Sequence, residues 1–229
     1  MKYNTVLFDA DDTLLDFKLS EKCALTSVLK SFELPYGEET ISIYSEINQS
    51  LWKLLELGGI TKDALKVERF RQFCEKMQFN ISADEMANRY VNELAKQSYI
   101  IKDADKVCER VYLSGIRTYI VTNGIKHIQT QRFNGCPLKK YFSDVFISED
   151  IGCEKPNIEF FNKVFSSIGI TEKEGVLLVG DSLSSDIKGG INAGIDTCWY
   201  NPHGKGSPSD MKITYEIRDL WELLDILEI

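Results

Sequence analysis

Three aspartates lie within four positions near the start of the chain, in the segment FDADDT, where Asp9, Asp11 and Asp12 follow the apolar run TVLF. Carboxylates this close repel one another, so they lie either in a solvated loop or around a cation. Carboxylate oxygens are ligands that Mg²⁺ takes in proteins, and a carboxylate also serves as a covalent nucleophile or as a general acid and base. The segment therefore predicts metal-assisted chemistry if further polar groups converge on it.

Polar residues also follow three later apolar runs of the chain. The runs are short and rich in β-branched and aromatic residues, which is typical of strands. The carboxyl ends of neighbouring parallel strands meet at one edge of a sheet, where ligands bind, so we expect these residues to converge. The residues at the three ends are Thr122, Asn123 and Gly124, then Glu149 and Asp150, and then Gly180, Asp181 and Ser182.

The acidic residues among these strand ends suit a magnesium site. Asp9 and Asp181, together with the backbone carbonyl of Asp11, would offer hard oxygen ligands and leave room for water and phosphate oxygens. Asp186, in the segment GDSLSSD, would either join the metal ligands or support Lys155 from behind. The sequence leaves open which of Asp181 and Asp186 binds the metal directly.

The remaining polar groups suit an anionic phosphoryl group. Thr122 offers a hydroxyl, and Asn123 and Gly124 offer backbone amides. Lys155, in the segment EKPN, offers a compact positive charge before a predicted helix. Asp11, two residues after Asp9, would face another side of the loop, where it could protonate a leaving oxygen and later activate water. Any one of these residues alone is more simply explained as loop solvation, but four strand ends together favour a catalytic site.

The elements that must position these residues alternate between strands and helices in the second half of the chain. Near-continuous apolar strands separated by amphipathic helices, such as the one that Asn157 would cap, are typical of a parallel sheet covered on both faces. We therefore predict an α/β fold with a three-layer, Rossmann-like core. The predicted strands cover residues 5–8, 118–121, 144–147, 175–179 and 197–200.

The interval between the first two predicted strands is far longer than one crossover connection needs. It contains helical patterns alone, at residues 18–34, 37–57, 61–79 and 82–98, with Thr61 as a predicted N-cap and SADE (82–85) as a predicted capping box. A further helix at 103–114 would belong to the crossover itself. We therefore predict an inserted helical cap domain at residues 17–98 and a catalytic core formed by residues 1–16 and 99–229.

Composition and charge argue against several classes of function. The formal net charge of −8 argues against nucleic acid as a partner. No apolar run has the roughly 18 residues that a membrane span needs, and the N-terminal stretch does not resemble a signal peptide. The six cysteines show no CxxC spacing and are most simply reduced thiols of a cytoplasmic protein. We expect a monomer or a homodimer that acts on a small molecule.

Four segments resemble the motifs of the haloacid dehalogenase superfamily in order and spacing: FDADDT, IVTNG, EKPN and GDSLSSD. The resemblance implies Mg²⁺ as cofactor, Asp9 as the nucleophile that forms an aspartyl phosphate, and Asp11 as the general acid and base. It also implies that Thr122 and Lys155 bind the phosphoryl group. Dehalogenases of the superfamily lack the second aspartate, because a halide leaves without a proton, so Asp11 favours phosphate-ester hydrolysis. The helical insertion corresponds in position to the superfamily's C1 cap.

A narrower resemblance concerns the substrate. INQSLWKLLELGGITKDALKVERF, ISEDIGCEKPN and GDSLSSDIKGGINAGIDTCWYN are similar to the bacterial house-cleaning 5′-nucleotidases, which act on pyrimidine and non-canonical nucleoside monophosphates. The resemblance implies a 5′-nucleotidase. Two alternatives keep the same chemistry, namely a sugar-phosphate phosphatase and a phosphoglucomutase-like enzyme. A third, a non-catalytic regulatory module with this fold, is disfavoured by the full motif set.

Side chains of the predicted cap could select the substrate. Trp52, Tyr44 and Phe70 would form an aromatic wall for a base, but Tyr44 and Phe70 are better explained as core residues, so Trp52 is the predicted substrate contact. Lys66 and Arg69 are more simply explained as solvated charges than as substrate ligands.

A helix is also expected after the second strand. His127 and Gln131, four positions apart, would lie on one face of it, close to Thr122 in the sequence. A substrate role for this pair is the less favoured explanation, because most such side chains are solvated.

Overall fold

A computed structural model describes residues 2–229 of the chain, which form two compact units. Residues 17–97 make up one unit, and the other comprises the residues before and after that insertion. No helix among the described residues is long and apolar enough to cross a membrane. We call residues 17–97 the helical unit and the remaining residues the core unit.

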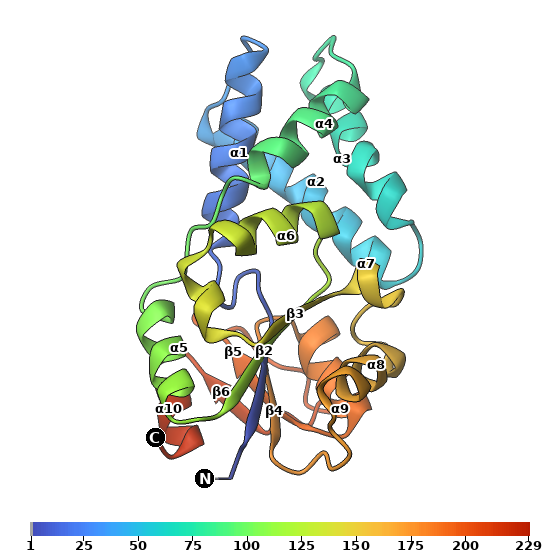
Figure 1. Ribbon diagram of the computed structural model, residues 1–229. Coiled ribbons are helices and arrows are strands. Elements are labelled where there is room, and N and C mark those ends of the chain that lie inside the picture. Colours follow the sequence, from blue (N-terminus) through green and yellow to red (C-terminus); the bar gives the residue numbers. More distant parts are fainter. Residues whose placement is uncertain (1) are drawn as a thin grey trace. The chain divides into compact units, whose positions relative to one another are not determined.

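The core unit is built on a six-stranded, wholly parallel sheet in the order β3-β2-β1-β4-β5-β6 (Figure 1). The predicted α/β fold with a parallel sheet is confirmed, and five strands agree with the predicted runs to within one residue. β6 has no counterpart among the predicted strands, because it is very short and carries the exposed Glu216 at its centre. The strands are β1 (Thr5–Phe8), β2 (Arg117–Thr122), β3 (Asp144–Ile147), β4 (Val176–Gly180), β5 (Asp196–Tyr200) and β6 (Tyr215–Ile217).

Helices cover both faces of this sheet. Successive side chains of β1 point to opposite faces, so Val6 and Phe8 join one apolar cluster and Leu7 joins the other. α5 and α10 pack on the first face, and α8 and α9 pack on the second (Figure 1). The helices are α5 (Ala104–Leu113), α6 (Lys126–Gly135), α7 (Ser148–Ile151), α8 (Ile158–Ile168), α9 (Lys188–Ala193) and α10 (Glu222–Leu227), with a 3₁₀ turn at Pro137–Tyr141 and a π-helical turn at Leu183–Ile187.

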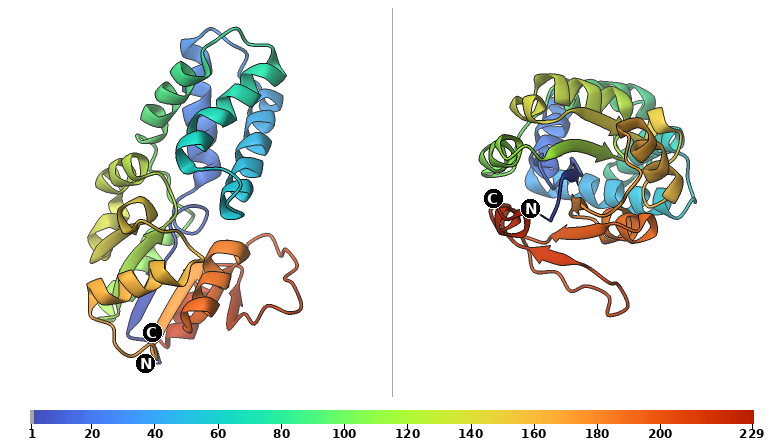
Figure 2. Two further views of the ribbon diagram at one scale, coloured as in Figure 1. Left: turned by 90° about the vertical axis from the view of Figure 1, so that its right-hand side faces the viewer. Right: turned by 60° about the horizontal axis from the view of Figure 1, so that its bottom comes forward.

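The helical unit is a bundle in which α1 packs against α4 and α2 against α3 (Figure 2). Two predicted caps are present, since the Thr61 hydroxyl accepts from the Ala64 N–H (3.2 Å) and the Ser82 hydroxyl accepts from the Glu85 N–H (3.4 Å). α1 ends earlier than predicted, because Glu33 adopts a left-handed conformation (φ 56°). The helices are α1 (Phe17–Ser31), α2 (Glu38–Glu56), α3 (Lys62–Met77) and α4 (Ala83–Leu94).

Aromatic residues fill the centre of this bundle. Tyr44 and Phe70 are fully buried with their ring centroids 5.1 Å apart, so both are core residues, as predicted. Arg69 is not the solvated charge that we predicted, since it is 1% exposed. Its Nη1 donates to Asn48 Oδ1 (3.1 Å), and Asn48 Nδ2 donates to Glu21 Oε1 (2.8 Å). The arginine therefore belongs to a buried polar chain that links α1, α2 and α3.

Candidate active site

The ends of β1, β2 and β4 form the polar edge of the core sheet. β1 pairs with both β2 and β4, so the residues that follow these three strands emerge side by side. Asp9 follows β1 directly, and its N–H donates to the carbonyl of Val179 on β4 (2.8 Å). This bond holds the aspartate at the sheet edge, where parallel α/β sheets bind their ligands.

Lys155 is a cation at the centre of the site and is 2% exposed. Its ammonium donates to Asp9 Oδ1 (2.7 Å), to Asp186 Oδ1 (2.7 Å) and to the carbonyl of Val121 (2.8 Å), which uses all three of its protons. Burial alone would lower the pKa of this ammonium, but the carboxylates of Asp186 and Asp9 outweigh burial and raise the pKa above its ordinary value. Lys155 is therefore a permanent positive charge within the site.

The side chain of Asn123 holds the loop that carries this lysine. Its Nδ2 donates to the carbonyl of Lys155 (2.8 Å), and its Oδ1 accepts the N–H of Lys155 (2.9 Å). The prediction placed Asn123 at the site through its backbone amide. The structure shows in addition that its side chain ties the end of β2 to the loop before α8.

Three carboxylates face one another at this edge. Asp9, Asp181 and Asp186 each offer an oxygen, and these oxygens lie within 4.8 Å of one another. Burial raises the pKa of Asp9 to about 7, against the opposing effect of Lys155. Burial raises the pKa of Asp181 well above its ordinary value, and the charges of Asp9 and Asp186 add to that shift. Three clustered carboxylates with a single ammonium leave excess negative charge, so the donor set fits a divalent cation.

Asp181 and Asp186 have different surroundings. Asp186 is fully buried, and its two oxygens are engaged by the Lys155 ammonium and by the N–H of Ser182 (3.1 Å). Gly180 makes room for it, because a Cβ at that position would collide with the Asp186 side chain. The backbone carbonyl of Asp181 accepts the indole N–H of Trp199 (2.9 Å). That bond fixes the Asp181 backbone and leaves its carboxylate available to the cluster.

Asp11 lies on the other side of the β1 loop and is bound by two residues of α6. Gln129 Nε2 donates to its Oδ2 (2.8 Å), and Arg132 Nη1 forms an ion pair with its Oδ1. Gln129 Nε2 also donates to the Thr122 hydroxyl (2.9 Å), which in addition accepts the N–H of Gly124 (3.1 Å). The structure therefore brings Asp11, Thr122 and Gly124 together.

Gln129 and Arg132 were not among the predicted site residues. The prediction considered His127 and Gln131 on the same helix, but both are exposed. A signal was available, because Ile125, Ile128 and Phe133 mark a helical stripe that also contains positions 129 and 132. Polar residues on an otherwise apolar stripe are buried and must find partners.

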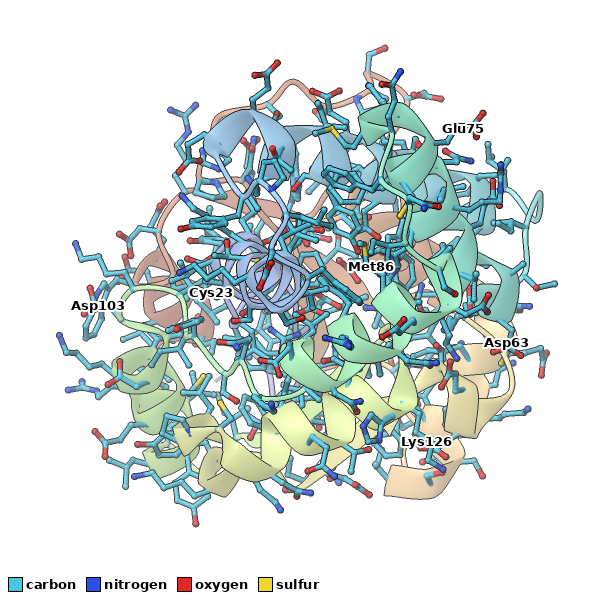
Figure 3. The ribbon with its side chains drawn as sticks, turned by 90° about the horizontal axis from the view of Figure 1, so that it is seen from above. Cys23, Asp63, Glu75, Met86, Asp103 and Lys126 are labelled. Atoms are coloured by element: carbon cyan, nitrogen blue, oxygen red, sulfur yellow. The ribbon has the colours of Figure 1, made fainter. Side chains whose placement is uncertain are left out.

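Two acidic residues that follow β3 bind elsewhere. Glu149 accepts the backbone N–H of Lys126 (2.8 Å), and Asp150 forms an ion pair with the Lys126 ammonium at the start of α6. Figure 3 labels Lys126, whose side chain is largely exposed. This third strand end therefore supports α6 rather than the acidic cluster. Trp52, the predicted substrate contact, lies on α2 of the helical unit and is half-buried.

A parallel α/β core with a helical insertion after its first strand, and with a lysine buried among carboxylates at the sheet edge, defines a class of metal-assisted hydrolases. The chain belongs to one family of that class, the haloacid dehalogenase-like hydrolases, whose family model matches residues 6–200. The predicted family is confirmed. The chain is an enzyme of this family, and its similarity to pyrimidine 5′-nucleotidases makes it a hydrolase of phosphoric monoesters.

Relatives match the chain over its whole length. Pyrimidine 5′-nucleotidase PynA of Streptococcus pneumoniae is 39% identical over 228 residues, which cover 100% of this chain and 96% of PynA. Pyrimidine 5′-nucleotidase YjjG of Escherichia coli is 30% identical, with 99% of each chain covered. The crystal structure of Bacillus subtilis YfnB bound to magnesium is similar at a TM-score of 0.94 and 38% identity, with 100% of both chains covered.

Proposed function

We propose that the chain is a Mg²⁺-dependent 5′-nucleotidase that releases phosphate from pyrimidine or non-canonical nucleoside monophosphates. The observation that carries this proposal is the set of groups at the sheet edge, where Asp9, Lys155 and the acidic cluster adjoin Asp11 and Thr122. PynA and YjjG, the two relatives named as pyrimidine 5′-nucleotidases, support the choice of substrate. The similarity covers residues of the helical unit as well as the core.

In the proposed mechanism, an Asp9 oxygen attacks the phosphorus atom and forms an aspartyl phosphate, while the bond from phosphorus to the ester oxygen breaks. Asp11 supplies the proton that the leaving ribose oxygen needs. Asp11 then accepts a proton from water as that water attacks the phosphorus atom, which releases inorganic phosphate and restores the Asp9 carboxylate. Atoms and charge balance over the two steps, and Asp11 ends in its starting form.

Thr122 is the proposed donor to the phosphoryl oxygens, and Lys155 is proposed to attract them through its charge, because its three protons already go to Asp9, Asp186 and the Val121 carbonyl. The Thr122 oxygen already accepts N–H groups from Gly124 and Gln129, so its hydroxyl proton is left to donate to a phosphoryl oxygen. The backbone amide of Asn123 is a further proposed donor, whereas the predicted donor Gly124 already directs its N–H at the Thr122 hydroxyl (3.1 Å). The Lys155 ammonium offsets the charge of Asp9, which lowers the repulsion between that carboxylate and an anionic substrate.

Asp9, Asp181 and the carbonyl of Asp11 are the proposed ligands of Mg²⁺, with Asp186 behind them. We assign direct binding to Asp181 because both oxygens of Asp186 already have donors, Lys155 and Ser182. When bound, the ion would neutralise the excess carboxylate charge and draw electron density from the phosphoryl oxygens. The six cysteines are free thiols, which supports a cytoplasmic enzyme.

Magnesium should stabilise the protein, and more so above pH 7 than at pH 5. In the metal-free protein the raised pKa of Asp9, about 7, means that the folded state holds a proton that the unfolded state has lost. The contribution of Asp9 to stability therefore falls as the pH rises from about 4 to about 7, with unfolded Asp at pKa ~3.9. Saturating Mg²⁺ at about 100 times its Kd should add about 2.7 kcal/mol, which is roughly 5–10 °C in Tm for a chain of this size.

Thermal unfolding with Mg²⁺ or with a chelator, at pH 5 and pH 8, measures this effect. Asp181→Asn is the control and should lose most of the shift, because it removes a proposed ligand. A Tm that does not respond to Mg²⁺ at pH 8 would contradict the metal assignment.

A panel of phosphomonoesters tests the function itself. The purified enzyme should release inorganic phosphate from pyrimidine nucleoside monophosphates faster than from sugar phosphates, and only with Mg²⁺. Phosphate release from sugar phosphates but not from nucleotides would replace the substrate proposal. Transfer of phosphate between positions of a sugar, without release of inorganic phosphate, would indicate a mutase.

A further inference from the structure

The carboxylate of Asp11 is held by two donors that are themselves inaccessible to solvent. Arg132 is 0% exposed and Gln129 is 1% exposed, whereas the Asp11 side chain remains 27% exposed. Arg132 Nη1 also donates to Gln129 Oε1 (3.1 Å), so the two donors are connected to each other. One face of the carboxylate is therefore bound by protein, while the carboxylate remains open to a ligand.

α6 provides these two donors from the face that it buries. Ile125, Ile128 and Phe133 pack into the core unit, and positions 129 and 132 lie on the same stripe at the i, i+3 spacing of neighbours on a helix. Apolar residues there would pack without the desolvation cost of a buried guanidinium. The arginine nevertheless places its buried charge against Asp11, which suggests a role for that charge at the carboxylate.

Gln129 contacts both the proposed proton-transfer group and the proposed phosphoryl-binding hydroxyl. Its amide nitrogen donates both to Asp11 Oδ2 (2.8 Å) and to the Thr122 hydroxyl (2.9 Å). Gly124 makes this possible, since a Cβ at that position would lie 2.5 Å from Gln129 Nε2. The orientation of the proton-transfer group and that of the phosphoryl-binding hydroxyl are thus set by one side chain.

We infer that Gln129 and Arg132 are positioning residues that aim Asp11 at the leaving oxygen of the substrate. This inference rests on the proposed phosphatase function. In this role the two residues act through Asp11, which both contact, and Gln129 also acts through Thr122. A purely structural ion pair is the alternative, and it predicts equal losses of activity for all substrates.

The test compares two leaving groups. A nucleoside 5′-oxygen must be protonated as it leaves, whereas p-nitrophenolate leaves without a proton. In Arg132→Met, kcat/KM for the nucleoside monophosphate should fall about 100-fold, as expected for a misplaced catalytic group. For p-nitrophenyl phosphate, kcat/KM should fall less than about tenfold, because this ratio reports the first step alone. A burst of p-nitrophenolate should then appear, because water attack on the aspartyl phosphate still needs Asp11.

Three further variants make the test specific. Arg132→Lys keeps the charge and should recover most of the nucleotide activity. Asp11→Asn should show the same leaving-group preference as Arg132→Met, and adding Arg132→Met to it should cause no further loss in nucleotide kcat/KM. Arg117→Met makes the same substitution at an exposed arginine, which is bound to Thr5 Oγ1 (3.1 Å) at the opposite edge of the sheet. This control should affect both substrates alike.

Equal losses for both esters in a folded Arg132→Met, or a further loss in the Asp11→Asn background, would overturn the inference. If Arg132→Met does not fold, Gln129→Met replaces it. This variant keeps the ion pair but removes a donor to Asp11 and a donor to Thr122, so both esters should lose activity and the nucleotide should lose more. The wild-type rates distinguish a failure of this inference from a failure of the proposed function. Wild-type enzyme that is inactive on nucleotides but active on another alkyl phosphate would refute the nucleotidase proposal, and the same comparison would then be made with that ester.

Discussion

Asp9→Asn should reduce phosphate release by at least about 10⁴-fold, the scale of loss seen when a nucleophile is removed from a catalytic unit. The amide has nearly the size of the carboxylate but cannot attack phosphorus, so no aspartyl phosphate forms. The substituted side chain would also lack the charge that pairs with Lys155 at 2.7 Å, although its amide oxygen can still accept that hydrogen bond. Initial rates on a nucleoside monophosphate with saturating Mg²⁺ measure the effect.

Asp12→Asn is the matched control for this variant, because it makes the same change three residues away. Asp12 adopts a left-handed backbone (φ 58°), which asparagine tolerates well, so the fold of the loop should be kept. Its activity should stay within about threefold of wild type, because Asp12 has no role in the proposed reaction and acts on the site only through its charge near Asp181. Comparable losses in the two variants would mean that the loop charge, and not a nucleophile at position 9, supports the reaction.

Much of the fold of both units follows from signals that are local in the sequence. Strands β1 to β5 are short apolar runs, and Thr61, Ser82 and Asn157 cap helices as their side-chain chemistry predicts. The meeting of Asp9 and Asp181 follows from one topological rule, that parallel strands end at a common edge. Neither inference requires knowledge of which residues an individual side chain contacts.

The errors concern residues whose environment is set by distant segments. The sequence around Arg69 is typical of a solvated helix face. The residue is nevertheless buried, because Asn48 on another helix accepts a hydrogen bond from its guanidinium. Gln129 and Arg132 become site residues only because Asp11, more than 100 positions earlier, lies opposite them. Glu149 follows a strand as a site residue would, but the free N–H of Lys126 at the start of α6 binds it. Sequence periodicity identified neither the partners nor the distances of these residues.

Lys155→Met should abolish activity and also destabilise the metal-free protein by about 3–5 kcal/mol, the cost of removing one partner from a buried ion pair. The lysine ammonium is the partner of both Asp9 and Asp186, and all three side chains are buried. Without it, these carboxylates would face each other in the metal-free protein with no ammonium between them. Urea unfolding with a chelator, monitored by circular dichroism, measures the loss.

The double variant Lys155→Met/Asp186→Asn separates the structural role of the lysine from its catalytic role. Removing the Asp186 charge leaves Asp9 and Asp181 as the carboxylates of the cluster, so the double variant should recover at least about half of the stability lost in Lys155→Met. Activity should not return, because no ammonium is left to offset Asp9 when the phosphate approaches. Stability that falls further in the double variant would show that Asp186 supports the fold independently of Lys155. Activity that returns with the stability would mean that the lysine serves the fold and not the reaction.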